Sequence, residues 1–308
     1  MKKVLITILI GLLIFPTNLV SAVGANNDKE RASGLSRSIE EKTGVSDIIK
    51  SKLNEDLYTD NTKINLPSNG TNHVKVSDLE NKTNSFEMLL PKEANNTNST
   101  ISTNGTIVYN NEANSNANVA LQPTNDGFRS LVIINNLSAS KDYTFEFILP
   151  KGSRLITAKE YLGSECDTKE VFVVNKDNVI TSLISPPWAK DANGSNVPTY
   201  YRVEGNKVIQ VVEFTKNNVF PIVADPSAWK ITKCIGAIGA MGITLAVPIA
   251  KIAKIRKFIK IIGSVKEAAM LLTGATSAAE KSGAVRAALK NLIYEISGIA
   301  GVISQCRF

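Results

Sequence analysis

The heptapeptide YTFEFIL (Tyr143–Leu149) decides how the middle of this chain is interpreted. Its aromatic residues Tyr143, Phe145 and Phe147 alternate with polar residues. Side chains two positions apart on a β-strand point to the same face of the sheet. We therefore expect this segment to be a strand with one aromatic, buried face.

Similar runs flank this heptapeptide and are separated by Asn, Gly, Lys-Asp and Pro turns. Short β-branched and aromatic runs of this kind are typical of β-sandwiches and barrels, and they predict a β-sandwich-like domain over residues 105–225. The last run predicts a hairpin that turns at Gly205-Asn206. The runs are TIVY (Thr106–Tyr109), VALQP (Val119–Pro123), FRSLVII (Phe128–Ile134), RLITA (Arg154–Ala158), EVFVV (Glu170–Val174) and RVEGNKVIQVVEF (Arg202–Phe214).

Residues 23–104 give weaker signals. The segment Gly34–Leu57 predicts one helix, although its apolar residues follow the helical period only loosely. From Asn61 to Asp126 the chain is rich in Asn, Thr and Ser, and such a composition buries too little apolar surface to offset the entropy lost on ordering. We expect linker or loop through much of this range, with its single histidine, His73, lacking a partner.

The N-terminus has the pattern of a secretory signal peptide over residues 1–22. Two lysines precede the apolar run Val4–Phe15, and small residues end at Ala22. Cleavage is expected after Ala22, with Ala25 as the second choice. The alternative is an uncleaved membrane anchor, which the short apolar run disfavours because a span needs about 20 residues. The sequence thus predicts a secreted, extracellular protein that is a substrate of signal peptidase.

The net positive charge lies entirely in the last part of the chain. Residues 1–225 contain 23 Lys and Arg against 25 Asp and Glu, a net of −2, whereas residues 226–308 contain 12 against 3, a net of +9. This asymmetry indicates a polyanionic partner, either nucleic acid or anionic lipid. We expect no nucleic-acid partner, because the chain is exported and only Phe258 is interleaved with the basic cluster as a stacking aromatic.

Residues 226–308 also predict an all-α unit. Asp225 suits the N-cap of a helix with Pro226 in its first turn, and two capping boxes mark later helix starts. The expected fold class is therefore α+β in separate domains, with a β-sandwich-like region followed by a cationic four-helix unit. The four expected helices are about Ala228–Val247, Lys251–Ile262, Val265–Leu272 and Ala278–Ile303. Gly263 is expected to end the second of them.

Two adjoining segments of this unit suit a membrane. CIGAIGAMGITLAVPIA (Cys234–Ala250) carries no charge, and KIAKIRKFIK (Lys251–Lys260) predicts a cationic amphipathic helix. Anionic bacterial membrane lipids are the expected partner, and a solvated basic face on a soluble bundle is the alternative. Trp229 is either a core residue or an interfacial anchor. The expected membrane-binding residues are Trp229, Lys251, Lys254, Arg256, Lys257, Phe258 and Lys260.

The chain has three cysteines. Cys234 and Cys306 bracket nearly the whole basic region, and Cys166 lies well outside it. Because export permits disulfides, a Cys234–Cys306 bridge is expected, with two buried free thiols as the alternative.

The motifs of the common enzyme classes are missing. A single histidine cannot build a Ser-His-Asp triad or a Cys-His pair. The sequence contains no zinc-ligand spacing, no P-loop and no dinucleotide-binding fingerprint. We expect no enzymatic activity, no metal and no cofactor.

Several features along the last 83 residues occur in a specific order and spacing. They are Trp229 followed by Lys233-Cys234, the KIAKIRKFIK segment, KEAAMLLTGAT (Lys266–Thr276), LKNLIYEISGIAG (Leu289–Gly301) and Cys306. Together they resemble the mature peptide of the closticin-type clostridial bacteriocins. FPIVADPSAW (Phe220–Trp229) is similar to a junction in secreted Gram-positive proteins with a β-rich pro-domain. The resemblance implies a signal peptide, a long pro-region and a mature peptide, residues 226–308, released by a processing protease at the Asp225–Pro226 bond.

The resulting expectation is a secreted bacteriocin precursor. Its cationic C-terminal peptide would permeabilise the membranes of related Gram-positive bacteria, and an immunity protein in the producer is a further expected partner. The alternative function is that of an extracellular β-domain, a binding or surface module anchored to the membrane by the C-terminal helices.

Overall fold

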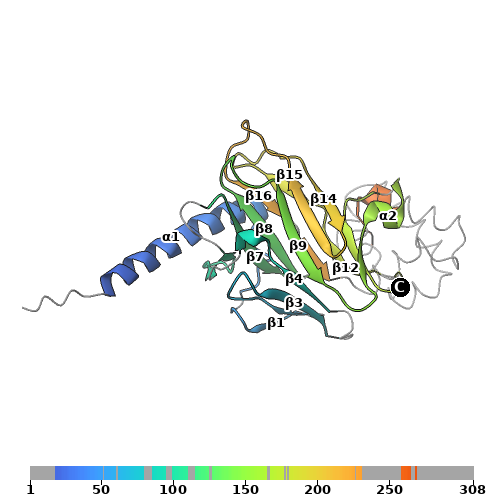
Figure 1. The fold of residues 1–308 in the computed structure, drawn as a ribbon, viewed down its shortest axis with the longest axis horizontal. Coiled ribbons are helices and arrows are strands. Elements are labelled where there is room, and N and C mark those ends of the chain that lie inside the picture. Colours follow the sequence, from blue (N-terminus) through green and yellow to red (C-terminus); the bar gives the residue numbers. More distant parts are fainter. Residues whose placement is uncertain are drawn as a thin grey trace, which may run out of the picture.

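The computed structural model describes residues 18–50, 52–59, 62–79, 85–94, 99–109, 115–124, 127–164, 167–176, 178, 180–225, 227–230, 258–264 and 268. Two antiparallel β-sheets dominate this part of the chain, and the N-terminal end of helix α1 (Asn18–Thr43) projects away from them (Figure 1). The shorter helical elements are α2 (Ala158–Leu162), the 3-10 helix η1 (Lys92–Ala94) and a helical turn at residues 258–262.

The smaller sheet has seven described strands in the order β1-β2-β3-β4-β9-β15-β14, and each neighbouring pair is antiparallel. Its last two strands form the expected hairpin, which turns at Gly205 (φ 61°) and Asn206, so this prediction is confirmed. The strands are β1 (Asp56–Tyr58), β2 (Thr62–Asn65), β3 (His73–Asp78), β4 (Phe86–Leu89), β9 (Asp142–Ile148), β14 (Thr199–Glu204) and β15 (Lys207–Val212).

The larger sheet follows the order β10-β11-β12-β17-β8-β7-β6-β5, and a further strand, β16, pairs with both β13 and β8. Strand β8 lies near its centre and pairs with β7 over eight residues. The strands are β5 (Thr100–Ile101), β6 (Ile107–Tyr109), β7 (Ala117–Thr124), β8 (Gly127–Ile134), β10 (Arg154–Thr157), β11 (Val171–Val174), β12 (Ile180–Ile184), β13 (Trp188–Lys190), β16 (Ile222–Asp225) and β17 (Ser227–Lys230).

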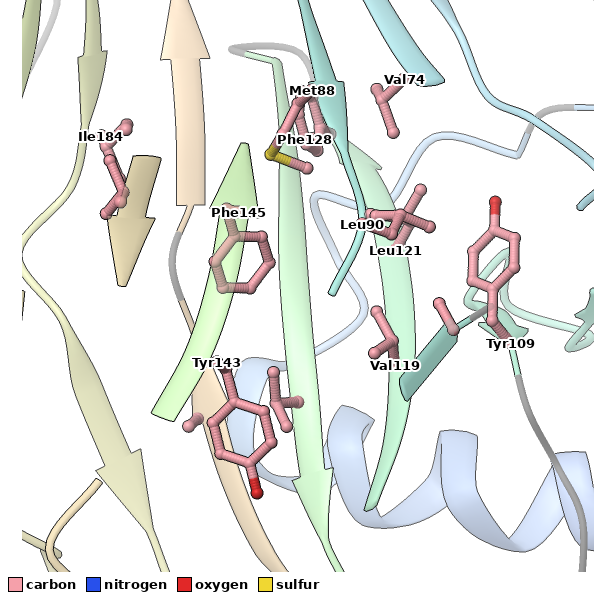
Figure 2. Close-up of a cluster of buried hydrophobic side chains, with 14 of the residues drawn as sticks. Val74, Met88, Leu90, Tyr109, Val119, Leu121, Phe128, Tyr143, Phe145 and Ile184 are labelled. Carbon is pink, nitrogen blue, oxygen red and sulfur yellow. The ribbon is translucent and has the colours of Figure 1, made fainter. Parts of the chain in front are cut away.

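The main hydrophobic core contains side chains from both sheets. On β9, Tyr143, Phe145 and Phe147 are buried, whereas Thr144 and Ile148 are exposed, as the alternation of the sequence requires. Burying an aromatic side chain of this size contributes about 1.5–3 kcal/mol. Figure 2 shows core side chains from both sheets, among them Val74, Met88 and Phe145 of the smaller sheet and Val119, Leu121 and Phe128 of the larger one.

Helix α1 packs on the larger sheet through a second, smaller core. Its Ala32 and Ile39 are buried in a cluster with β-strand residues Val108, Ala120, Leu131, Ile133 and Val223. The Glu40 carboxylate accepts hydrogen bonds from the hydroxyls of Ser102 (3.0 Å) and Thr106 (2.7 Å). These contacts fix the second half of α1 against the β5–β6 turn.

The expected fold class is wrong. Residues beyond Pro226 were expected to begin a separate all-α unit, but Ser227–Lys230 form strand β17, which pairs with β8 and β12. In the described part of the chain no four-helix unit follows, and the only helical residues after β17 are 258–262 and 268. Helix signals at an Asp-Pro start are local, and here pairing with two strands distant in the sequence overrides them. The remaining stretches of the four expected helices lie outside the described residues.

The range expected to be linker also differs. Strands β1 to β5 all lie before residue 102, with burial alternating along β2 and β4. Ile64, Val74 and Met88 point into the core from these strands. Asn, Thr and Ser dominate the composition, but the inward positions of β2, β3 and β4 are mostly apolar, with Thr62 as a buried exception.

Two smaller expectations are also corrected. The helix predicted over Gly34–Leu57 ends at Thr43, because Gly44 has φ +74° and donates its amide to the Glu40 carbonyl (2.8 Å), a common helix C-terminus. His73 does have a partner, since its Nδ1 lies 2.7 Å from Glu87 Oε2. The hydrogen bond from His73, and then the nearby Lys75, lower the pKa of Glu87 despite its partial burial.

Candidate processing junction

The Asp225–Pro226 bond, the expected cleavage site, lies between two strands that continue one another. Strands β16 and β17 both pair antiparallel with β8, with Ala224 opposite Val132 and Ser227 opposite Arg129. From Ala224 to Ser227 the chain advances by three residues, and from Val132 to Arg129 the paired residues of β8 also differ by three. The pairing register with β8 is therefore the same before and after the junction. Strands β16 and β17 therefore lie along one line beside β8, on either side of Pro226.

On its other side this line changes partner. Strand β16 pairs with β13, with Asp225 opposite Trp188, whereas β17 pairs with β12, with Trp229 opposite Leu183. Both strands that flank the junction thus have neighbours on two sides, as in the centre of a sheet. A protease reaches such a bond only when the strands open locally.

The Asp225 side chain is part of what holds the junction closed. It is 3% exposed, and the indole Nε1–H of Trp188 donates a hydrogen bond to its Oδ2 at 2.9 Å. Trp188 is held in turn, because the side-chain amide of Gln210 donates to its backbone carbonyl (3.3 Å) and to Thr199 Oγ1 (3.2 Å). A buried carboxylate is stable only when such donors replace water.

Tyr201 adds a second buried polar group beside the junction. Burial raises the pKa of its hydroxyl well above the ordinary value, and the negative charge of Asp225 adds to the effect. Among the described residues its hydroxyl oxygen has no hydrogen-bond partner. The group therefore stays protonated and neutral beside Asp225.

The expected signal-peptidase site lies within a continuous helix in the folded chain. Helix α1 begins at Asn18 and passes Ala22 and Ala25 without interruption. The part of α1 that Glu40 fixes to the sheet is downstream of both positions, where Lys42 Nζ also donates to the Ala192 carbonyl (2.9 Å). Removal of residues 1–22 would leave these contacts in place.

Two of the expected membrane-binding side chains, Phe258 and Lys260, are described. Phe258 and Ile259 are buried, whereas Lys260 and Ile261 are exposed, so the turn at residues 258–262 has one apolar, covered face. The turn ends at Gly263, which has φ +99° and donates to the Ile259 carbonyl (2.8 Å). In this chain Phe258 is therefore withheld from solvent.

The other expected site residues contribute less. Trp229 lies in β17, where its backbone pairs with Leu183 and Gly127. The remaining ones lie outside the described residues: Pro226, Lys251, Lys254, Arg256, Lys257, Cys166, Cys234 and Cys306. Among the described residues, no helix is long and apolar enough to cross a membrane, and no group of three or more His, Cys, Asp or Glu is placed to hold a metal ion.

Sequence reasoning missed both the strand after Pro226 and the role of Trp188. Within Ser227–Lys230 only Trp229 is a residue type that favours strands, so the local sequence carries little signal for β17. No sequence signal connects Trp188 with Asp225, because they are far apart in the chain and meet only through the pairing of β13 with β16.

Comparison with known proteins adds no family. No protein-family model matches the chain, and no curated protein matches it.

Proposed function

We propose that this chain is the secreted precursor of a C-terminal cationic antimicrobial peptide, a bacteriocin, and that its β-rich part is the pro-region. The observation that carries the proposal is the charge partition, with a net of +9 over residues 226–308 and −2 over the rest. The resemblance of the last 83 residues to closticin-type peptides supports it. Signal peptidase and a processing protease would act on the chain, and the producer would need an immunity protein.

The cationic cluster explains attraction to the target. Lys251, Lys254, Arg256, Lys257 and Lys260 would each contribute about 1 kcal/mol near an anionic membrane surface. Phe258 would then enter the interface with the apolar side of the same segment. Because Phe258 is buried in the precursor, part of this apolar side is covered before release.

The junction geometry adds a requirement for processing. Since the chain around Asp225 is paired on two sides, the protease must act before β17 docks or after the strands open. Cleavage of the fully folded precursor should therefore be slow and should follow the rate or population of local opening.

The test compares the intact precursor with purified residues 226–308, separated from the rest of the chain. Released residues 226–308 should leak dye from vesicles rich in anionic lipid, leak less from zwitterionic vesicles, and inhibit growth of related Gram-positive bacteria. The uncleaved precursor at equal concentration is the control and should do neither. If the released peptide neither leaks dye nor inhibits growth, the proposal is wrong.

The continuity of β16 and β17 favours a second candidate, an extracellular β-module that works as an intact chain. The sheet includes residues on both sides of the expected cleavage bond, as it would in a protein that is never cut there. Mass spectrometry of culture supernatant and of cells distinguishes the two. A free fragment of residues 226–308 supports the precursor, and an intact chain retained with the cells supports the module.

A further inference from the structure

Strand β17 belongs to the expected product, and its two described pairing partners, β8 and β12, belong to the β-rich part. We propose that after cleavage at Asp225–Pro226 these residues keep the C-terminal peptide bound to the β-rich part as a non-covalent, inactive complex. The inference rests on the proposed function, because it concerns the product that the cleavage would release. It makes withdrawal of β17, and not the cut itself, the step that frees the peptide.

The first step of the argument is that the cut removes none of β17's pairing. Its register partners are Arg129, Phe128 and Gly127 of β8, and Ser182, Leu183 and Ile184 of β12. All of them precede the Asp225–Pro226 bond in the chain. Hydrolysis of that bond breaks one covalent link and leaves the pairing on both sides of β17 in place.

The second step is the place of β17 in the sheet order. Strands β10, β11 and β12 connect to β8 within this sheet through β17. Without β17, the edges of β8 and β12 would lose their neighbour, at positions where Phe128, Leu183 and Ile184 are buried. Exposing unpaired backbone groups and apolar side chains at a sheet edge costs free energy and invites pairing with other chains. The bound position of β17 is therefore favoured after the cut.

The third step is that an added strand gives affinity through main-chain hydrogen bonds, as in donor-strand complementation. The four residues of β17 pair on two sides, so the cut chain keeps a bound segment at its new N-terminus. The cationic segment Lys251–Lys260 follows some twenty residues later in the same fragment. A peptide held in this way cannot move freely to a membrane.

The experiment uses the full precursor with the recognition sequence of a specific protease inserted between Asp225 and Ser227. After cutting, size-exclusion chromatography with mass spectrometry of each peak reports whether the fragments stay together. We expect them to co-elute and to leak little dye from anionic vesicles. An excess of a synthetic peptide with the sequence of residues 226–232 should displace the product and start the leakage.

The variant Ala228→Pro removes a backbone N–H in a central strand, where proline is not accommodated. Its fragments should separate as soon as the bond is cut. Ser227→Ala is the matched control, because it keeps every backbone donor, and its fragments should co-elute. Should Ala228→Pro fail to fold, hydrogen exchange of the cut wild-type protein decides, with the amides of residues 182–184 and 227–230 expected to stay protected.

The outcomes separate this inference from the proposed function. If wild-type fragments part at once, and the amides of residues 182–184 lose protection on cutting, the inference is overturned, even where the freed peptide leaks dye. If the fragments stay together but the displaced peptide leaves vesicles intact, retention stands and the antimicrobial function fails.

Discussion

Replacing Trp188 with phenylalanine tests how the junction is kept closed. The change removes the indole N–H that donates to Asp225 Oδ2 at 2.9 Å and keeps an aromatic ring at the same position. The carboxylate is 3% exposed, so water cannot replace the donor without opening the structure. A hydrogen bond to a charged group contributes about 1.5–3 kcal/mol.

This energy converts into a change in local opening. Because each 1.4 kcal/mol is about a factor of ten, opening of the β16–β17 line should rise about 10- to 150-fold in Trp188→Phe. Hydrogen exchange of the amides of residues 223–225 measures it directly, under conditions in which exchange reports the open population. Limited proteolysis should show faster cutting at the same place.

Tyr200→Phe is the matched control for this substitution. Tyr200 lies on β14 and is 47% exposed, so loss of its hydroxyl should leave exchange near the junction unchanged. The reasoning is refuted if residues 223–225 of Trp188→Phe exchange at the wild-type rate while the protein remains folded. It is also refuted if Tyr200→Phe accelerates exchange as much.

Three further predictions follow from other parts of the molecule. Phe145→Ala should lower the free energy of unfolding by about 3–5 kcal/mol in denaturant titrations, whereas Ile148→Ala, on the same strand but 48% exposed, should cost far less. The lowered pKa of Glu87 means that its ion pair stabilises the protein above pH 4.5 and loses this effect as pH falls through the lowered pKa. At pH 7, Glu87→Gln should therefore have a lower melting temperature than wild type, with a loss of less than about 1 kcal/mol in the free energy of unfolding because the pair is partly exposed. This difference between variant and wild type should vanish on acidification. A difference that stays constant with pH contradicts the prediction. Gly34→Ala should raise the free energy of unfolding by about 0.5–1 kcal/mol, and with it the melting temperature, because the added methyl group in α1 meets no atom within 4 Å.

The central strands were predictable because their information is local. The alternation of Tyr143, Phe145 and Phe147 states the strand and its buried face, and the hairpin turn at Gly205 is set by neighbouring residues. Strand β2 was not predicted, because four residues are too few for an alternating pattern to stand out in an Asn- and Thr-rich sequence.

The strand after Pro226 could not be found in this way. Whether Ser227–Lys230 forms a helix or a strand depends on edges offered by β8 and β12, and neither edge is visible in the local sequence. The same holds for Asp225, which reads as a helix cap but is buried against Trp188. Asp225 followed by proline does favour a helix start. At this position the pairing of β17 with β8 and β12 overrides that local preference.

The place of β17 also sets the order in which the sheet is completed during synthesis. Residues 127–129 and 182–184 leave the ribosome well before residues 227–230, their common neighbour. Until that neighbour arrives, the sheet has a gap between β8 and β12. Pairing over so long a separation forms late and slowly. The sheet thus has a period during folding in which β8 and β12 lack a neighbour at these positions, and that period ends when β17 pairs with both.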